Sequence, residues 1–595
     1  MFFTQYNPMT TEEVNAKIDA KRKADGQSCG CLAGLSFKCR LEGDYAPQQL
    51  DYKFIDADNL EFVENGTTYE APYTAISYGK MTLFTHLVPG TTRGWHVVLD
   101  RVTKNLTVFE TWFGITVPVG GSMFVKKEPD YYRDIPREIQ REYYFGWADF
   151  GDNEKPAKYN TTTNRLEGRG LHWDFSTGYE ILTFFPSLCS STVVQLGKHM
   201  GDITMANGSD YIRIDDEFYI FTRWEVEFGG KMWLEILDFY DNKAVGMEFG
   251  FDVETVVLTY ATHTAKLEIT GDAAHLEGIY ELGDKKRPMS MSKAKGSRYA
   301  YRPMDMDPPM SHEEALQHAA ESQRIFEVDG PNIMASKNNL PFSEFLIGKQ
   351  FKVKLDNELH AIAPWSGKDG KVYEYDVFSK RYLRFREEGG EWQEEKYICY
   401  EPARDIYFFS HMITGDPDYA NLTHAIDFST GLATTIRAQI GNWHSEWEIG
   451  SQVKFGTLIY GDIKAPFARR HHFTTDLVGK SYSWTYSEKM SSIHVYSSPE
   501  SSSWTIFSGD NSGGATWSSP CYYIRLRDDA YIFQWVEENC NGMQGLVIIN
   551  PQILHDGGFF FGVSRTGLSL NITGAFGREL GTFNIKKYFD PTANL

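Results

Sequence analysis

Large apolar residues alternate with polar ones along much of the chain, and the clearest stretch of this kind occurs twice. Residues 211–221 read YIRIDDEFYIF and residues 523–533 read YIRLRDDAYIF. Both copies are rich in β-branched and aromatic residues around a central acidic pair, which predicts a strand, a turn and a second strand. A match of this length, half a chain apart, indicates an internal duplication.

The two-residue period of a strand assigns these side chains to common faces. In the second copy, Tyr523 and Arg525 share a face of the first predicted strand. The corresponding face of the following strand carries Tyr531, Phe533, Trp535 and Glu537. A face on which aromatic rings alternate with charged groups is a candidate wall of a ligand pocket.

The duplication extends beyond this stretch. THLVPGTTRGWHVVLDRVTKNLTVFETWFG (85–114) parallels SHMITG followed by LTHAIDFSTGLATTIRAQIG (422–441), so that His86 corresponds to His411. A second module then opens in each half, with LEGRGLHWDFSTGY (166–179) and LVGKSYSWTYSEKM (477–490). Each half therefore contains two strand-rich modules in the same order.

Short helices are predicted between these modules. Residues 10–25 combine capping-box spacing with apolar residues one turn apart, and a similar signal begins at Ser311. Pro129 and Pro136 bracket a third candidate helix, which would connect the first two modules. Residues 283–310 are basic and rich in Ser, Pro and Met, a composition typical of a linker.

The predicted fold is all-β. Four modules with short strands and turn signals, such as Asn65-Gly66 and Asn541-Gly542, fit antiparallel meander barrels in two tandem pairs. Closure into barrels removes the exposed sheet edges of a chain this rich in strands. A small closed barrel can also hold one small ligand inside.

Composition and charge narrow the function. Aromatic residues make up 15% of the chain, and its net charge of −21 argues against nucleic-acid and anionic-membrane partners. The first residues lack a signal-peptide pattern, and no stretch approaches membrane-spanning length, so we expect a cytoplasmic protein. The seven cysteines lack paired CxxC spacing and are expected to be free thiols, and the alternative for Cys29 and Cys31 is a redox or metal role.

Motifs for metal and nucleotide chemistry are absent from the sequence. There is no HExxH, P-loop, GxSxG or dinucleotide fingerprint, so we expect no cofactor and no metal. His471 and His472 stand beside two arginines and are interpreted as part of a solvated basic turn. His312 and His318 are six residues apart on a predicted helix, hence on different faces.

The order of these motifs resembles the MoaF family, named for molybdenum cofactor biosynthesis protein F. The resemblance rests on LAG near the start, REYYFGWAD, LVGKSYSWTYS, SPCYYIRLRDDAYIFQWVEE, and LVIINP with GGFFFG. It implies calycin-like (lipocalin-like) barrels, here in two tandem pairs. The implied domains are a lead-in (1–31), two barrels (32–150 and 151–282), a linker with a helix (283–345) and two further barrels (346–465 and 466–595).

The last module also resembles the phenolic acid decarboxylases, another calycin-like family. In that family two tyrosines hold the substrate carboxylate and a glutamate is catalytic, roles that the resemblance carries to Tyr486 and Glu537, with Trp484 in place of the first tyrosine. The expected glycine–arginine pair is absent, and Arg525 is proposed as its substitute. A carboxyl group inside an aromatic barrel would have its pKa raised by burial, which suits a general acid.

The sequence thus predicts one main site and one accessory site. The main site has the candidate catalytic residues Glu537, Tyr486 and Arg525 and the candidate substrate-binding residues Trp484, Tyr523, Trp535, Tyr531 and His494. The accessory pocket residues are Tyr211, Arg213, Trp173, Trp224, His86 and His411.

The first copy is predicted to be degenerate. YIFTRWEVE carries one residue more than YIFQWVEE before its tryptophan, so a bulge is expected to keep Trp224 facing inward. Val226 would then occupy the position of Glu537, and Phe175 stands where Tyr486 is. We therefore expect the second module of the first half to be a scaffold or an accessory site.

Three functions remain open at this level. The first is a cofactor-free enzyme of the lyase, decarboxylase or cyclase type that acts on a small aromatic or conjugated molecule in the last barrel. The second is a lipocalin-like carrier of a hydrophobic or aromatic ligand without catalysis. The third is an interaction scaffold whose barrels are filled by their own side chains. The sequence does not decide the oligomeric state.

Overall fold

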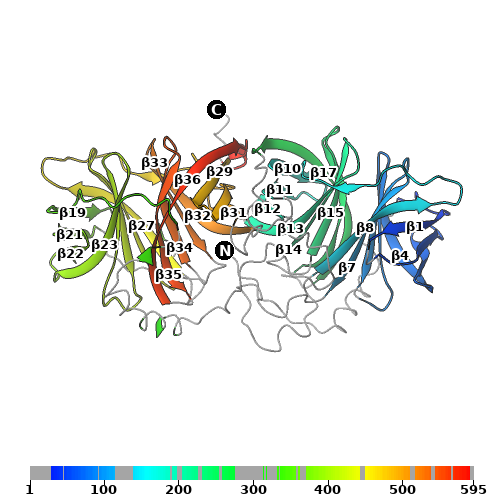
Figure 1. The fold of residues 1–595 in the computed structure, drawn as a ribbon, viewed down its shortest axis with the longest axis horizontal. Coiled ribbons are helices and arrows are strands. Elements are labelled where there is room, and N and C mark those ends of the chain that lie inside the picture. Colours follow the sequence, from blue (N-terminus) through cyan, green and yellow to red (C-terminus); the bar gives the residue numbers. More distant parts are fainter. Residues whose placement is uncertain are drawn as a thin grey trace. The chain divides into compact units, whose positions relative to one another are not determined.

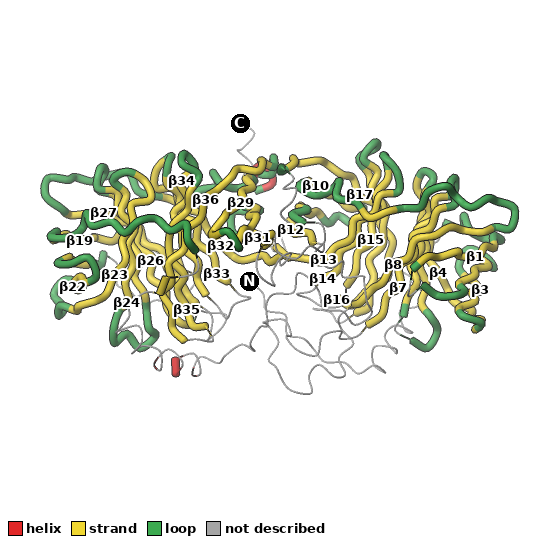
Figure 2. Tube along the Cα trace, viewed as in Figure 1, coloured by secondary structure: helices red, strands yellow, loops and turns green. Residues whose placement is uncertain are grey.

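A computed structural model gives the conformation of most of the chain. The described residues are 29–43, 46–91, 93–113, 139–187, 190–196, 204–225, 231–252, 257–274, 313, 316–317, 320, 332–333, 336–356, 360–361, 370–441, 449–508, 516–537, 543–564 and 567–589. Strands and their connecting loops account for nearly all of them (Figure 1; Figure 2). The two barrels of each half form one compact unit.

The described residues of the first half form seventeen strands. They are β1 (Ser36–Glu42), β2 (Leu50–Phe54), β3 (Asn59–Glu64), β4 (Thr67–Tyr78), β5 (Met81–Leu87), β6 (Gly94–Asp100), β7 (Asn105–Phe113), β8 (Ile139–Asp149), β9 (Thr161–Thr162), β10 (Arg169–Phe175), β11 (Glu180–Phe184), β12 (Ser190–Leu196), β13 (Thr204–Arg213), β14 (Phe218–Glu225), β15 (Lys231–Asp238), β16 (Lys243–Asp252) and β17 (Val257–Asp272).

The second half repeats this pattern with small additions. Its strands are β18 (Asn332–Ile333), β19 (Gln350–Leu355), β20 (His360–Ala361), β21 (Val372–Val377), β22 (Tyr382–Glu387), β23 (Gln393–Ala403), β24 (Ile406–Met412), β25 (Asn421–Asp427), β26 (Leu432–Ile440), β27 (Ile449–Ile459), β28 (His472–Phe473), β29 (Lys480–Ser487), β30 (Met490–Val495), β31 (Ser501–Ser508), β32 (Thr516–Arg527), β33 (Ala530–Glu537), β34 (Met543–Asn550), β35 (His555–Ser564) and β36 (Gly567–Thr582).

These strands form four closed, eight-stranded antiparallel barrels, which confirms the predicted fold class. Barrel 1 consists of β1–β8 and barrel 2 of β10–β17. Barrel 3 consists of β19 and β21–β27, and barrel 4 of β29–β36. The short strands β9, β18, β20 and β28 add to the barrels from outside. Closure pairs the first strand of each barrel with its last, as in the pairing of β29 with β36.

The predicted connecting helices are not seen as elements of the described chain. Residues 10–25 and the segment between Pro129 and Pro136 lie outside the described residues, and the sequence that follows forms β8, the strand that closes barrel 1. After Ser311 and before β18, the described residues are Glu313, Leu316, Gln317 and Ala320, and all four are helical. A 3-10 turn at Lys586–Tyr588 follows barrel 4.

Alternate residues of the duplicated stretch pack into two different cores, one inside the barrel and one between the paired barrels. Tyr523 and Phe533 face the interior of barrel 4, where their rings stack with centroids 5.7 Å apart. Ile524 and Ile532 face outward and pack with Ile398, Ile406 and Phe408 of barrel 3. In the first half Ile212 and Ile220 pack in the same way against barrel 1. The strands are buried on both faces, so both sets of positions are apolar.

Polar contacts between the paired barrels differ between the halves. In the first half, Lys80 of barrel 1 pairs with Asp215 of barrel 2 and lies 3.1 Å from Asp100. Arg141 of barrel 1 also forms a buried ion pair with Asp210 of barrel 2, with 2.6 Å between Nε and Oδ2. These contacts place cations of barrel 1 against carboxylates of barrel 2.

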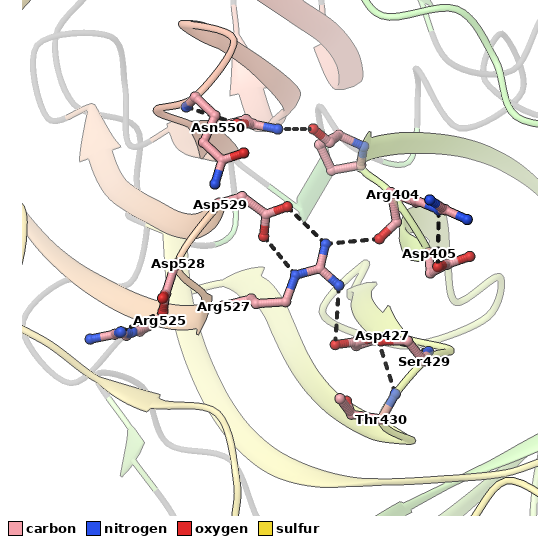
Figure 3. A network of polar contacts seen from close by, with 12 residues as sticks. Arg404, Asp405, Asp427, Ser429, Thr430, Arg525, Arg527, Asp528, Asp529 and Asn550 are labelled. Carbon is pink, nitrogen blue, oxygen red and sulfur yellow. Dashed lines mark hydrogen bonds and ion pairs between the residues drawn. The ribbon is translucent and has the colours of Figure 1, made fainter.

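In the second half the cation comes from the other barrel (Figure 3). Arg527 of barrel 4 binds Asp529 of its own turn, donates to the carbonyl of Arg404 and lies 3.6 Å from Asp427 of barrel 3. Asn550 adds a bond from Nδ2 to the carbonyl of Pro402, at 3.0 Å. The register aligns Asp427 with Asp100, so the same buried carboxylate faces a lysine of its own barrel in one half and an arginine of the neighbouring barrel in the other.

Two predictions about cysteine and histidine were wrong. Cys29 and Cys31 form a disulfide, so the described cysteines are not all free thiols; Cys39, Cys399 and Cys521 are free and buried. His471 is not in a solvated turn, because it is 1% exposed and its Nδ1 lies 2.8 Å from Oγ1 of Thr434. His312 and His318 lie outside the described residues.

Candidate functional site

The interior of barrel 4 is lined by a continuous cluster of aromatic rings. Phe533 stacks on Trp535 at 4.7 Å and on Tyr523 at 5.7 Å, and Tyr496 meets Phe533 edge-on at 5.1 Å. On the other side of the barrel, Tyr496 contacts Tyr482 at 5.9 Å. These rings come from strands far apart in the sequence and meet only because the barrel closes. Such a wall offers stacking surfaces to a planar ligand.

Small residues make room for the two tryptophans of this cluster. A Cβ atom at Gly545 would lie 2.3 Å from the ring of Trp535, and one at Gly577 would lie 2.5 Å from the ring of Trp484. Each glycine pairs across the sheet with the tryptophan that covers it. The glycines therefore allow the indoles to lie flat against the inner wall of the barrel.

His494 is the first polar group of this interior. It contacts the rings of Tyr496, Phe533 and Trp535 at 6.1–6.3 Å. Burial lowers its pKa to about 3, so the imidazole is neutral at physiological pH. Within the described residues no hydrogen bond to this ring is formed, which leaves its nitrogens available to a ligand.

Asp556 is the second polar group, and sequence reasoning missed it. It lies on β35, on the same strand face as Phe560, whose ring contacts that of Trp535 inside the barrel. Burial raises its pKa to about 8, although the backbone N–H of Ala575 donates to its Oδ1 at 2.7 Å and opposes the shift. The carboxyl group is thus mainly protonated at neutral pH and can donate a hydrogen bond. This is the chemistry that the sequence assigned to Glu537.

The predicted catalytic set is not brought together. Arg525 is 36% exposed at one end of the barrel, where it binds Asp476 at 2.9 Å and Asp528 at 2.5 Å. Glu537 ends the strand that begins beside Arg525, and the six residue steps from Tyr531 to Glu537 span roughly 20 Å. The side chain of Glu537 lies outside the described residues. A shared role of Arg525 and Glu537 on one small ligand is therefore excluded by the length of β33.

The other predicted residues of the last barrel divide into two groups. Trp484, Tyr523, Trp535 and His494 all belong to the aromatic interior. Tyr531 instead donates to Asp476 beside Arg525, at 3.3 Å. Tyr486 lies at an irregularity in β29 and is half-buried, and its carbonyl accepts a hydrogen bond from the N–H of Lys337.

The arginine of the duplicated stretch has the same structural role in both copies. Arg213 binds Asp216, and Arg525 binds Asp528, each three residues further along. Tyr211 donates to the carbonyl of Ser190, and Tyr523 to the equivalent carbonyl of Ser501. These contacts hold the turn and the neighbouring strand, which explains why the residues recur.

The expected bulge in the first copy does not exist, and the alignment built on it was wrong. β14 pairs without interruption with β13 and β15, and Trp224 pairs with Gly208 and Met232. Counted along this register, Arg223 takes the position of Trp535, and Glu225, not Val226, takes that of Glu537. The side chains of Trp224 and Glu225 lie outside the described residues.

Barrel 2 has its own aromatic interior. Trp173 stacks on Phe175 at 5.7 Å, and Phe175 contacts Trp233 at the same distance. Trp173 occupies the position of Trp484, but Phe185 stands where Tyr496 accepts the indole N–H of Trp484. The indole nitrogen of Trp173 consequently has no hydrogen-bond partner in the described part of the chain.

His86 and His411 lie in barrels 1 and 3 and not in the second modules. Nε2 of His86 lies 3.0 Å from the hydroxyl of Tyr52, and Nε2 of His411 lies 3.1 Å from that of Tyr375. In barrel 3 the Tyr375 hydroxyl also meets Nε2 of His424, at 2.6 Å. Burial lowers the pKa of His86 to about 3 and that of His411 to about 4. Both are neutral members of interior hydrogen-bond networks.

Neither a metal-binding cluster nor a membrane-spanning helix occurs among the described residues. No group of three or more His, Cys, Asp or Glu side chains there could hold a metal ion. None of the helical segments in the described chain is long and apolar enough to cross a membrane.

Comparison with known proteins gives one informative match. Residues 471–581, which cover barrel 4, match the model of the MoaF C-terminal domain. No curated protein is significantly similar. A putative beta-lactamase from Burkholderia vietnamiensis aligns at 17% identity over 18% of this chain and 96% of its own, with a TM-score of 0.16. A bifunctional GH43-CE protein from Bacteroides eggerthii aligns at 8% identity over 73% of this chain and 64% of its own, with a TM-score of 0.08.

Both structural likenesses are too low to support an argument about this chain. The informative similarity is that of the family model, whose matched residues form a closed barrel. Residues 471–581, which form the last barrel, are thus similar to the MoaF C-terminal domain.

Proposed function

We propose that barrel 4 binds a small, uncharged, planar aromatic or conjugated molecule. The observation that carries this proposal is the continuous ring cluster from Tyr482 through Tyr496 and Phe533 to Trp535. Planar ligands gain dispersion and stacking energy against such walls. An ionised ligand would lose its hydration among these rings, and the guanidinium of Arg525 is already paired with carboxylates at the barrel end.

Two polar groups give the site its orientation. The neutral His494 ring provides a donor and an acceptor, and the protonated Asp556 carboxyl provides a donor. A ligand with a carbonyl or ring-nitrogen acceptor matches Asp556, and one with a hydroxyl matches the imidazole acceptor. A mainly apolar pocket with a few polar groups is the usual composition of a small-molecule site.

The direct test is native mass spectrometry of the protein purified from its source, followed by calorimetric titration with 2-naphthol at pH 6.5. We expect either a retained aromatic molecule or binding of one naphthol per chain. His494→Phe keeps the ring and removes both nitrogens, and should weaken naphthol binding about tenfold, the value of one lost buried hydrogen bond.

The matched control is Thr183→Val, because Thr183 occupies the position of His494 in barrel 2. It should leave naphthol binding unchanged. If the two variants reduce affinity equally, or if the wild-type protein neither retains nor binds an aromatic molecule, the proposed site in barrel 4 is wrong.

Acid–base catalysis in the same barrel is a second candidate, favoured by the raised pKa of Asp556 alone. A carboxyl group with a pKa of about 8 retains its proton at neutral pH and suits a general acid. Catalysis requires that the wild-type protein converts the retained molecule and that Asp556→Asn binds it without conversion. Unchanged mass, absorption spectrum and chromatographic retention of the molecule after prolonged incubation with wild-type protein would leave binding as the function.

A further inference from the structure

A pair of exposed cysteines precedes the first strand of barrel 1. Cys29 and Cys31 are joined by a disulfide, and both residues are exposed. The free thiols of the described chain are all buried, and they are those of Cys39, Cys399 and Cys521. Among the described cysteines, the disulfide is therefore the sulfur group that a reagent in solution can reach.

The same turn exists in the second half without a disulfide. Counted back from the LAG and LIG sequences that follow, Ser343 and Phe345 occupy the positions of Cys29 and Cys31. The N–H of Cys29 donates to a carbonyl of β4 at 3.0 Å, and the N–H of Ser343 donates to the equivalent carbonyl of β23 at 2.8 Å. The turn thus forms without a cross-link, and a disulfide that closes only three residues removes little chain entropy. A structural role does not account for it.

Gly30 brings the two cysteines together. Its φ of +63° lies in the left-handed region that favours glycine. Two residue steps of an extended chain span roughly 6.6–7.2 Å, whereas the Cα atoms of Cys29 and Cys31 are 5.3 Å apart, a separation that a disulfide can bridge. The residue at this position of the second half, Glu344, is not left-handed. The glycine and the two cysteines therefore occur together in one copy of the turn.

A hydrogen-bond donor lies at each sulfur atom. The N–H of Cys31 donates to Sγ of Cys29 at 3.4 Å, and Oγ of Ser77 lies 3.2 Å from Sγ of Cys31. Because a disulfide sulfur carries no hydrogen, the Ser77 hydroxyl is the donor in this contact. Oγ1 of Thr82 lies 2.6 Å from Oγ of Ser77 across the β4–β5 hairpin and donates to it in turn. Such donors stabilise the negative charge that a sulfur atom acquires when the disulfide opens.

We propose that Cys29 and Cys31 form a redox-active disulfide that exchanges with small thiols of the glutathione type. A thiolate of this kind bonds to Sγ of Cys29, the bond between Cys29 and Cys31 breaks, and its electron pair remains on Sγ of Cys31 beside the Ser77 hydroxyl. The site lies in barrel 1 and is independent of the ligand proposed for barrel 4.

A second thiolate completes the exchange. It attacks the sulfur of the first small molecule, and Sγ of Cys29 leaves with the electron pair of the mixed disulfide. Two small thiols are thereby oxidised to one disulfide, and the two electrons reduce the bond between Cys29 and Cys31. The protons of the two small thiols pass to the two cysteines. Oxidised glutathione drives the same steps in reverse.

The test is equilibration of the full chain with glutathione at pH 7.4. Free thiols are trapped with N-ethylmaleimide, and peptide mass spectrometry measures Cys29 and Cys31 separately from Cys39. We expect reduced glutathione to open the disulfide and oxidised glutathione to restore it. The buried thiol of Cys39 should stay unlabelled throughout, which shows that barrel 1 remains folded.

Two variants of Ser77 examine the donor beside Cys31. Ser77→Ala should slow reduction by glutathione about tenfold, because the departing thiolate loses a hydrogen bond. Ser77→Thr keeps a hydroxyl group and should retain the wild-type rate. The matched control is Ser36→Ala, a change at an exposed serine of β1, which should leave the rate unchanged.

Cys31→Ser examines the second sulfur atom. With oxidised glutathione this variant should accumulate a mixed disulfide at Cys29, because no neighbouring thiol remains to displace the glutathione. The proposal is overturned if glutathione neither opens nor restores the disulfide in the folded chain. It is also overturned if Cys39 becomes labelled together with the pair, or if Ser77→Ala and Ser36→Ala exchange at equal rates.

Discussion

Barrels 2 and 4 share most of their strand register, yet their interior polar groups stand at different positions of it. In barrel 4 these groups are on the strands before and after the duplicated hairpin, with His494 on β30 and Asp556 on β35. In barrel 2 the same positions hold Thr183 and Ala244. The buried basic and acidic side chains of its interior lie instead on β14, β15 and β17, and they are Arg223, Glu235 and His263. The barrel fold was therefore retained after duplication, while the polar residues of the interior moved to different strand positions.

The outward face shows the same divergence. Arg141, Asp210 and Thr222 form a buried polar contact between barrels 1 and 2. The equivalent positions between barrels 3 and 4 hold Ser451, Tyr522 and Gln534. The first half therefore depends on a buried ion pair where the second half has neutral groups, and the two halves should respond differently to substitution.

The largest expected effect is at this ion pair. Arg141→Leu leaves the Asp210 carboxylate buried without its partner and should lower the free energy of unfolding of the first half by roughly 3–5 kcal/mol. The matched change Ser451→Ala should cost less than about 1 kcal/mol. Urea titration, with hydrogen exchange of β8 and β13 to locate the transition, measures both. Equal costs would show that the ion pair does not distinguish the halves.

The next effect is the pH dependence that Asp556 gives the second half. Its pKa of about 8 in the fold exceeds the ordinary value of 3.8, so the native state holds a proton that the unfolded chain releases. Stability should fall by about 1.4 kcal/mol per pH unit between pH 4 and 8, or roughly 3 kcal/mol from pH 5 to 7, and level off above pH 8.

Asp556→Asn should remove this slope, as measured by urea unfolding at several pH values. The first half has Ala244 at the equivalent position and lacks this contribution. A slope unchanged in Asp556→Asn would assign the pH dependence to other groups and would weaken the contrast between the barrels.

The smallest effect concerns the packing of the rings in barrel 4. Gly545→Ala places a Cβ atom against Trp535, and the displaced indole should cost roughly 1–3 kcal/mol. The emission of Trp535 should shift to longer wavelength as its ring moves. A cost below about 0.5 kcal/mol would show that the barrel interior has free space into which the ring can move.

Alternation and turn spacing were sufficient to predict the barrels, because a strand that faces a core on one side has a visible period of two. They did not reveal which face meets the neighbouring barrel, since Tyr523 and Ile524 are both apolar and both buried. The prediction of short connecting helices rested on local capping patterns, which do not show whether a helix has a packing partner.

The candidate site was predicted in part. Four of the ring residues follow from alternation along β29, β30, β32 and β33, but Asp556 was missed because it precedes two glycines that break the apolar pattern. Arg223 was missed for a different reason. The sequence offers Trp224 and Trp535 as an apparent match, and only the hydrogen-bond register shows that Arg223 is the true counterpart.

The exchanged charges between the paired barrels have a consequence for how a duplicated chain folds. Lys80 and Asp405 occupy equivalent positions, as do Asp215 and Arg527. If barrel 1 associated with barrel 4 during synthesis, Lys80 would lie beside Arg527. If barrel 3 associated with barrel 2, Asp405 would lie beside Asp215. Tandem copies are prone to such exchange, and repulsion between like charges in a partly buried seam opposes it. The reversal of sign thus gives each nascent barrel a means of recognising its proper neighbour.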